Sequence, residues 1–263
     1  MSEKLVKYEA REGIAILTLD DAPLNAYTHE MMVDLDAAIL RARMDDSVHV
    51  IVLTGAGEKF FCVGANISML VNATPSFKYY FCLHANETLN RLEQTPKLVI
   101  AAINGHCVGG GLEVALACDL RVARRGGGKC GLPEVALGVL PGTGGTQRAV
   151  RLLGKSRALR LMTDGGTFDF ERAHELGLVD ELVDEHEDFL ESVLAFAGRY
   201  LPPNKAPRAV GLIKRACQSG AEMAFEQGLA LERELQQQLF TSMDAREGLL
   251  AYDQKRAPRF KGE

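Results

Sequence analysis

Residues 98–118, LVIAAINGHCVGGGLEVALAC, form an apolar stretch that contains a single acidic side chain, Glu113. Burying an ionised carboxylate in such surroundings costs several kcal/mol unless the group is paired or its pKa rises. Glycines at 109–111 stand just before it, and each lowers helix stability by roughly 1 kcal/mol relative to alanine. This costly combination indicates that the backbone must be approached closely beside the glutamate. The stretch therefore predicts a site that transforms an acyl group.

A second isolated glutamate, Glu134, lies in the run CGLPEVALGVLPGTGGTQ (130–147) and is followed by Gly142, Gly144 and Gly145. Two glutamates, each embedded in apolar and glycine-rich sequence, make a candidate general acid/base pair. The same pattern is equally compatible with two structural carboxylates, one capping a helix and the other in a salt bridge. The sequence alone leaves both interpretations open.

The composition is that of an ordinary globular protein, with 47% hydrophobic and 25% charged residues in a chain of 263, long enough to bury a large core. The formal net charge of -5 gives no electrostatic reason to expect nucleic acid. The six cysteines lie mostly in apolar surroundings and form no CxxC pair, which predicts reduced core thiols. Residues 29–33, HEMMV, lack the second histidine of a zinc HExxH motif, so no metal site is predicted.

Neither export nor a membrane span is predicted. The first residues, MSEKLVKYEAREG, include acidic side chains and no apolar core of a signal peptide. Residues 98–118 are long enough for a membrane helix, but Asn104, His106 and Glu113 would then lie in hydrocarbon. We therefore expect a cytoplasmic protein.

Hydrophobic periodicity predicts an α/β chain. Predicted strands are 6–10, 14–20, 48–54, 60–63, 98–103, 120–123 and 178–183, and predicted helices are 25–43, 77–93, 110–117, 143–153, 157–162, 170–176, 187–200, 205–219 and 221–240. Thr28 is the predicted N-cap of the first helix, and Asn204 is the predicted cap of the helix after Pro203. A strand, strand, helix unit recurs in the first half, and helices dominate after about Pro141.

Two glycine motifs do not support nucleotide binding. Gly154-Lys155-Ser156 lacks the first glycine of a phosphate loop, because Ala149 occupies that position. Residues 126–131, GGGKCG, have a dinucleotide-binding spacing, but Pro133 follows at once and no acidic residue between 135 and 163 is available to hold a ribose. No nucleotide cofactor is predicted.

Four segments, in this order, resemble the enoyl-CoA hydratase/isomerase (crotonase) family: FFCVGANISML (60–70), INGHCVGGGLEVALACDLRVA (103–123), GLPEVALGVLPGTGGTQR (131–148) and AYDQKR (251–256). The resemblance covers nearly the whole chain. It implies a crotonase-like α/β spiral of ββα repeats, residues 1–200, followed by a helical trimerisation and CoA-covering region, residues 201–263. It also implies a homo-oligomer, a hexamer built as a dimer of trimers.

The resemblance further implies where the reaction takes place. The backbone N–H groups of Ala65 and Gly110 would form an oxyanion hole for an acyl-CoA thioester, where negative charge grows as an enolate forms. The family's two glutamates correspond to Glu113, which would deprotonate the water that adds at C3, and to Glu134, which would protonate C2. The backbone of Gly142 would help to place that water.

The CoA contacts implied by the resemblance are Ala65, Ile67, Ser68, Phe240, Tyr252 and Lys255. Many family members carry a lysine where this chain has Ser68, so the sequence leaves open how the CoA phosphates are held. Tyr252 and Lys255 match positions that in the family close over the CoA of a neighbouring subunit, and Phe240 matches a pantetheine contact. All three are also compatible with plain surface or interface residues. CoA itself is part of the substrate, so no separate cofactor is implied.

Retention of both glutamates favours an enoyl-CoA hydratase, a lyase of fatty acid metabolism and β-oxidation. The alternative within the family is an enoyl-CoA isomerase or another enolate-forming acyl-CoA enzyme. An RNA-binding relative would need a stronger basic surface than residues 124–129 or 255–261 provide, and a catalytically inactive scaffold would need no lone glutamates. The sequence leaves the acyl group open, because the aromatic residues of 77–81 are expected to pack rather than to line its pocket.

Overall fold

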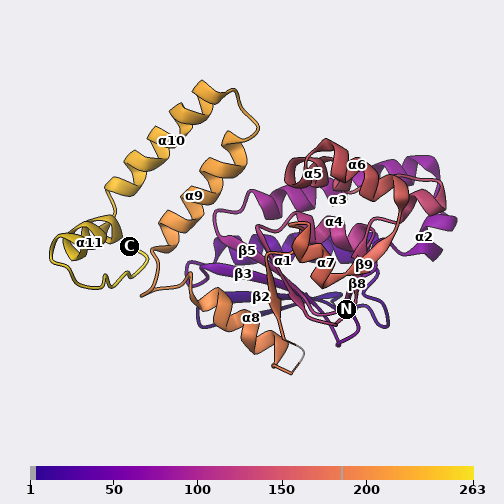
Figure 1. Ribbon diagram of the computed structural model, residues 1–263, viewed down its shortest axis with the longest axis horizontal. Coiled ribbons are helices and arrows are strands. Elements are labelled where there is room, and N and C mark those ends of the chain that lie inside the picture. Colours follow the sequence, from indigo (N-terminus) through magenta and orange to yellow (C-terminus); the bar gives the residue numbers. More distant parts are fainter. Residues whose placement is uncertain (1–3, 185) are drawn as a thin grey trace.

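The computed structural model describes residues 4–184 and 186–263, and its strands form two sheets (Figure 1). The six-stranded sheet contains, in spatial order, β1 (Val6–Arg11), β2 (Ile14–Leu19), β3 (Val50–Gly55), β5 (Leu98–Ile103), β7 (Leu120–Arg124) and β10 (Glu181–Val183). The four-stranded sheet contains β4 (Phe60–Cys62), β6 (His106–Val108), β8 (Lys129–Gly131) and β9 (Thr167–Asp169). Only the pairs β1–β2 and β8–β9 of these sheets are antiparallel.

Successive strands alternate between the two sheets. Strands β3, β5 and β7 pair in parallel in the larger sheet, and the strands that follow them in sequence, β4, β6 and β8, pair in parallel in the smaller one. Each turn of the chain therefore adds one strand to each sheet before a helical segment leads to the next turn. This topology confirms the predicted crotonase-like spiral of ββα repeats.

The inner strands β3 and β5 of the larger sheet are almost entirely apolar because both faces of the sheet are covered. In β3, the side chains of Ile51 and Leu53 join one buried cluster and those of Val50 and Val52 join another. The first cluster includes residues of α1 (His29–Met44), α3 (Pro75–Glu93) and α4 (Gly110–Leu116), and the second includes residues of α8 (Phe189–Gly198). The apolar runs from which the strands over 48–54 and 98–103 were predicted thus reflect burial on both faces of the sheet.

The remaining elements of the described chain are all helical. They are α2 (Ile67–Val71), the 3-10 helix η1 (Glu134–Leu137), α5 (Gly145–Leu153), α6 (Lys155–Asp164), α7 (Phe170–Glu175), α9 (Pro207–Gly220), α10 (Phe225–Phe240) and α11 (Met243–Asp253). Thr28 caps α1 as predicted, because its hydroxyl accepts the Met31 N–H at 3.3 Å. The predicted cap at Asn204 is wrong, since Ala206 occupies the cap position and Pro207 starts α9. Proline suits that first position because an N–H there would have no helical partner.

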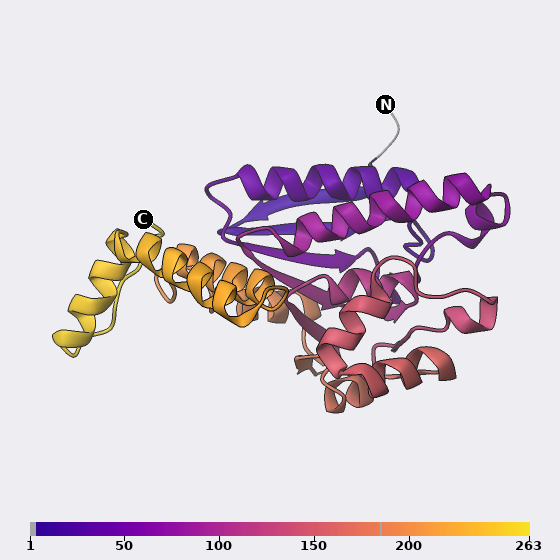
Figure 2. The same ribbon diagram turned by 90° about the horizontal axis from the view of Figure 1, so that it is seen from above.

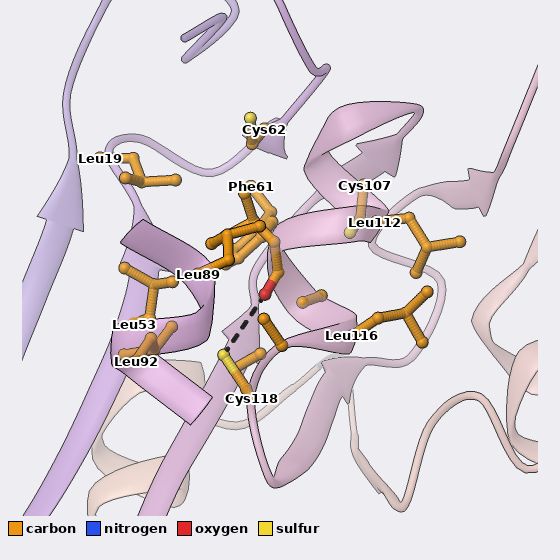
Figure 3. Packing of buried hydrophobic residues seen from close by; sticks show 14 of the residues in the cluster. Leu19, Leu53, Phe61, Cys62, Leu89, Leu92, Cys107, Leu112, Leu116 and Cys118 are labelled. Carbon is orange, nitrogen blue, oxygen red and sulfur yellow. Dashed lines mark hydrogen bonds between the residues drawn. The ribbon is translucent and has the colours of Figure 1, made fainter. Parts of the chain in front are cut away.

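Sulfur atoms are part of the main core. Figure 3 shows Cys62, Cys107 and Cys118 among leucine side chains of the larger cluster. Burial raises the pKa of Cys62, Cys118 and Cys130 to about 12, so these thiols stay protonated. The structure agrees with the prediction of reduced core thiols at these positions, whereas Cys217 is exposed.

Helices α9, α10 and α11 form an arm (residues 207–253) that extends away from the two sheets in Figures 1 and 2. Its first helix is fixed to the core by Lys214, whose Nζ forms an ion pair with Asp119 at 2.8 Å and donates to the Lys97 carbonyl oxygen at 3.0 Å. Large apolar side chains are exposed along the arm: Ile213, Phe225, Phe240, Met243, Leu249 and Tyr252. Even so, no described helix, in the arm or elsewhere, is long and apolar enough to cross a membrane.

Candidate active site

Helix α4 begins at Gly110, directly after Gly109, whose φ of 56° favours glycine. The segment that carries Ala65 runs beside this helix start, because a Cβ atom placed on Gly64 would lie 2.7 Å from the Gly110 nitrogen. The two residues predicted to hold a thioester oxygen therefore come from segments in direct contact. Their role as oxyanion-hole donors stays a prediction.

Glu113 lies in the first turn of α4 and is only 2% exposed. Its Oε1 atom accepts the backbone N–H groups of Thr143 and Gly145, both at 2.7 Å. Burial raises the pKa of Glu113, and these hydrogen bonds oppose the rise because they favour the charged form. Gly145 is the first residue of α5, so Glu113 also caps that helix, as one of the two sequence interpretations allowed.

Glu134 starts η1 and faces the other side of the same helix start. A Cβ atom placed on Gly109 would lie 3.1 Å from Glu134 Oε1. The second carboxylate oxygen, Oε2, is buried without a hydrogen-bond partner in the described part of the chain. Burial is the main cause that raises the pKa of Glu134 to about 7, and the charge of Glu113 contributes in the same direction. Both carboxyl groups therefore lie near the start of α4, but Glu113 accepts two backbone N–H groups, whereas one oxygen of Glu134 has no hydrogen-bond donor among the described residues.

Gly142, the residue predicted to place the water, lies in the loop that also provides the Thr143 N–H. Helix α3 holds this loop in position: Asn86 Nδ2 donates to the Gly142 carbonyl oxygen at 3.4 Å. Cys82 of the same helix is also close, since its Sγ atom would lie 3.4 Å from a Cβ atom placed on Gly142. The structure therefore brings Gly142 to the Glu113 side of the site. Its role in placing the water stays a prediction.

The remaining predicted CoA contacts are divided between two ends of the molecule. Ile67 and Ser68 are exposed on α2. Phe240, Tyr252 and Lys255 are exposed in the arm or just after it, and Figures 1 and 2 place α11 and α2 at opposite ends of one chain. Within a single chain these two groups do not meet. For a metal ion, the described residues offer no cluster of three or more His, Cys, Asp or Glu ligands.

The glycines at 109–111 have a packing role that the sequence did not specify. A Cβ atom on Gly110 would collide with the Tyr27 side chain, and one on Gly111 would collide with the Cys62 carbonyl oxygen. From the sequence we expected something to approach the backbone closely at these glycines. At Gly110 and Gly111 the atoms that do so belong to the protein itself. This close approach does not by itself point to a ligand.

Three residues near the glutamates escaped the sequence analysis. The positive charge of Lys78, on α3, acts on Glu113 and Glu134, where it opposes burial, the main cause of their raised pKa values. Tyr27 and Thr143 are joined by a buried hydrogen bond of 2.9 Å between their hydroxyl oxygens, across 116 positions of sequence. Pairs so far apart produce no spacing pattern that a single sequence could reveal.

The chain belongs to the enoyl-CoA hydratase/isomerase family, which it matches over residues 9–263. It is 35% identical over 248 residues to a short-chain-enoyl-CoA hydratase from Clostridium acetobutylicum, with 94% of each chain covered. It is also 35% identical over 267 residues to a 2,3-dehydroadipyl-CoA hydratase from Escherichia coli K12, with 100% of each covered. Its fold is similar to the crystal structure of an enoyl-CoA hydratase from Geobacillus kaustophilus, with a TM-score of 0.95 and 42% identity over 100% of this chain and 98% of that one. These matches confirm the family and the fold.

Proposed function

We propose that this protein is an enoyl-CoA hydratase, which adds water across the 2,3 double bond of a 2-enoyl-CoA thioester. The observation that carries the proposal is the pair Glu113 and Glu134, two adjoining carboxyl groups of which one accepts two N–H bonds and the other has an unpartnered buried oxygen. Two groups of one residue type can serve as base and acid when their surroundings separate their pKa values. Hydration needs such a pair, because one proton must leave the water and another must reach C2.

In this proposal Glu113 is the general base. The N–H groups of Thr143 and Gly145 favour its ionised form, which removes a proton from the water that attacks C3. The electrons of the double bond then move toward the thioester and give an enolate. Glu134, whose pKa burial raises to about 7, holds a proton near neutral pH and delivers it to C2. Each turnover leaves Glu113 protonated and Glu134 ionised, so the pair must exchange a proton before the next.

The enolate oxygen is assigned to the backbone N–H groups of Ala65 and Gly110. As the first residue of α4, Gly110 has an N–H that finds no acceptor within the helix. One preorganised donor of this kind stabilises a developing oxyanion by roughly 2.7–4 kcal/mol. The donors and the two glutamates would thus act on adjacent atoms of one acyl group.

The direct test is hydration of crotonyl-CoA by the purified protein, followed as the loss of the conjugated thioester absorbance. We expect this loss in the wild type, whereas conversion of a 3-enoyl-CoA into the conjugated form without hydration would favour the isomerase alternative. The two hydratases compared above are named for different acyl groups. Short, long, branched, cyclic and carboxylated 2-enoyl thioesters should therefore be compared by kcat/KM.

We also propose that the arm completes the CoA site of a neighbouring copy. Support comes from Phe240, Tyr252 and Lys255, which are exposed (88% for Tyr252) and lie on or just after helices that extend away from the two sheets (Figures 1 and 2). Residues 1–200 would then be the catalytic core and residues 201–263 the trimerisation and CoA-covering region of a dimer of trimers. Light scattering should give six times the 28.7 kDa chain mass. A fully active monomer would contradict this assembly.

A further inference from the structure

Tyr27 touches both segments of the site. Its N–H donates to the Gly64 carbonyl oxygen at 2.9 Å, and its own carbonyl oxygen accepts the Asn66 N–H at 3.0 Å, so that it forms a β-bridge with Ala65. Its side chain is 2% exposed and fills the space beside Gly110 that a Cβ atom there would need. The phenol ring therefore lies against the start of α4, next to the helical turn that carries Glu113.

The Tyr27 hydroxyl continues into a chain of hydrogen bonds. It lies 2.9 Å from Thr143 Oγ1, in a buried position. Burial and then the charge of Glu113 raise the pKa of Tyr27 well above its ordinary value, so the phenol keeps its proton. Burial likewise raises the pKa of Glu113, whereas the N–H groups of Gly145 and Thr143, and then the Thr143 side chain, lower it. Thr143 thus stands between the phenol and the carboxylate.

Thr143 connects the phenol to the carboxylate, because its backbone N–H donates to Glu113 Oε1 at 2.7 Å. An ionised carboxylate can only accept hydrogen bonds, so its charge depends on donors that are held in place. The Tyr27 hydroxyl, 2.9 Å from Thr143 Oγ1, fixes the side chain of the residue that supplies one of these donors.

We propose that Tyr27 is a positioning residue whose hydroxyl, acting through Thr143, holds Glu113 ionised and aimed at the attacking water, an inference that rests on the proposed hydratase function. Tyr27 does not touch the reacting atoms in this scheme. Its effect reaches the reaction only through the readiness of Glu113 to take a proton.

The other titratable and charged groups around this chain stay in place when the phenol hydroxyl is removed. They come from β4, α3, η1 and α5, and they are Cys62, Lys78, Cys82, Glu134 and Arg148. Replacing Tyr27 by phenylalanine keeps the ring, whose centroid lies 5.9 Å from that of Phe81, and deletes only the oxygen. A change in the behaviour of Glu113 can then be assigned to the missing hydrogen bond.

The test compares Tyr27→Phe, Thr143→Val and their double variant with the wild type. Loss of a hydrogen bond in a chain that ends on a charged group should lower kcat for hydration roughly tenfold with KM unchanged. The acid limb of the kcat profile should move up by about one pH unit, because a tenfold effect equals one pKa unit. The double variant should be no worse than Thr143→Val, and Thr143→Ser, which keeps the hydroxyl, should recover most of the kcat and of the acid-limb position that Thr143→Val loses. Tyr8→Phe, the same change made on β1, is the matched control and should leave kcat and the acid limb unchanged.

A second measurement separates this inference from the proposed function. Infrared titration of the Glu113 carboxyl, identified by its absence in Glu113→Gln, needs no turnover. A higher midpoint in Tyr27→Phe supports the coupling even if no enoyl thioester is hydrated, in which case only the hydratase assignment fails. An active wild type with the same midpoint, kcat and acid limb as Tyr27→Phe would reduce Tyr27 to a packing residue and overturn the inference.

Discussion

Glu113 is buried inside α4, and Asp119, which follows that helix, has a side chain only 10% exposed, so one short stretch carries two acidic groups that are largely removed from water. Burial raises the pKa of both. Asp119 forms an ion pair with Lys214 Nζ at 2.8 Å and accepts the Val99 N–H at 2.7 Å. Glu113 Oε1, in contrast, accepts hydrogen bonds from neutral backbone N–H groups. A carboxylate beside a cation is fixed in its charged state, whereas one held by neutral dipoles can still gain and lose a proton.

The largest expected effect comes from removing the ionisable groups of the site. Glu113→Gln and Glu134→Gln should each lower kcat for hydration by roughly 10²–10⁴, the usual range for a general acid or base. Thermal unfolding should show that both variants keep the fold, and the double variant should lose less than the product of the two single losses. Wild-type turnover by either single variant would refute the paired-carboxylate mechanism.

For Asp119 we expect the reverse, a loss of stability with unchanged turnover. Asp119→Asn leaves Lys214 buried without its counter-ion, so the free energy of unfolding should fall by about 3–5 kcal/mol. Denaturant titration at one fixed protein concentration would measure this loss, since assembly also contributes to apparent stability. The kcat of the folded fraction should stay at the wild-type value. Asp164→Asn is the matched control, because its pair with Arg160 is exposed and contributes less than about 1 kcal/mol.

The difference between the two carboxylates also predicts a pH dependence. Because Glu134 must be protonated and its pKa is raised to about 7, kcat/KM should fall as the pH rises above about 7. Glu113 must be ionised, so it governs the acid limb, although the two limbs belong to the coupled pair. Glu134→Gln should abolish the basic limb of any residual activity.

The free energy of unfolding should also depend on pH through Glu134, and the raised pKa of this group sets the sign of the dependence. Between pH 4.5, the ordinary value, and about 7, the folded chain binds more protons at Glu134 than the unfolded chain does. The contribution of Glu134 to the free energy of unfolding therefore decreases as the pH rises through that window and is constant above it. Chemical denaturation over this range should show the free energy of unfolding of Glu134→Gln rising relative to that of the wild type as the pH increases. Identical slopes would mean that the Glu134 pKa is not raised.

The smallest effect tests whether the glycine start of α4 is required by packing. Gly111→Ala would push a methyl group against the Cys62 carbonyl oxygen and should cost about 1–3 kcal/mol of stability. Gly198→Ala, in α8, has open space around its Cβ position and should instead gain about 0.4–1 kcal/mol. Equal stabilities of the two variants would show that the core yields easily at Gly111.

The sequence predicted the fold well because strands β3 and β5 are almost continuous apolar runs and the family pattern recurs along the chain. It missed the three-residue strands β6, β8 and β9, since hydrogen bonds to distant strands, and not local propensity, define them. It located both glutamates as isolated charges. It could not supply the Tyr27 to Thr143 contact or the charge of Lys78 near the pair, because these depend on how α3 and two loops pack.

The buried thiols make it possible to measure how often the core opens. Cys62, Cys107, Cys118 and Cys130 can meet an alkylating reagent only when the structure around them opens, and their modification rates in excess reagent therefore measure opening, much as amide exchange does. Cys217, exposed on α9, should be modified first and can carry a dye that reports on the arm. One protein sample, quenched at successive times and analysed by mass spectrometry, would thus give the rate at which each buried cysteine becomes accessible, without any engineered label.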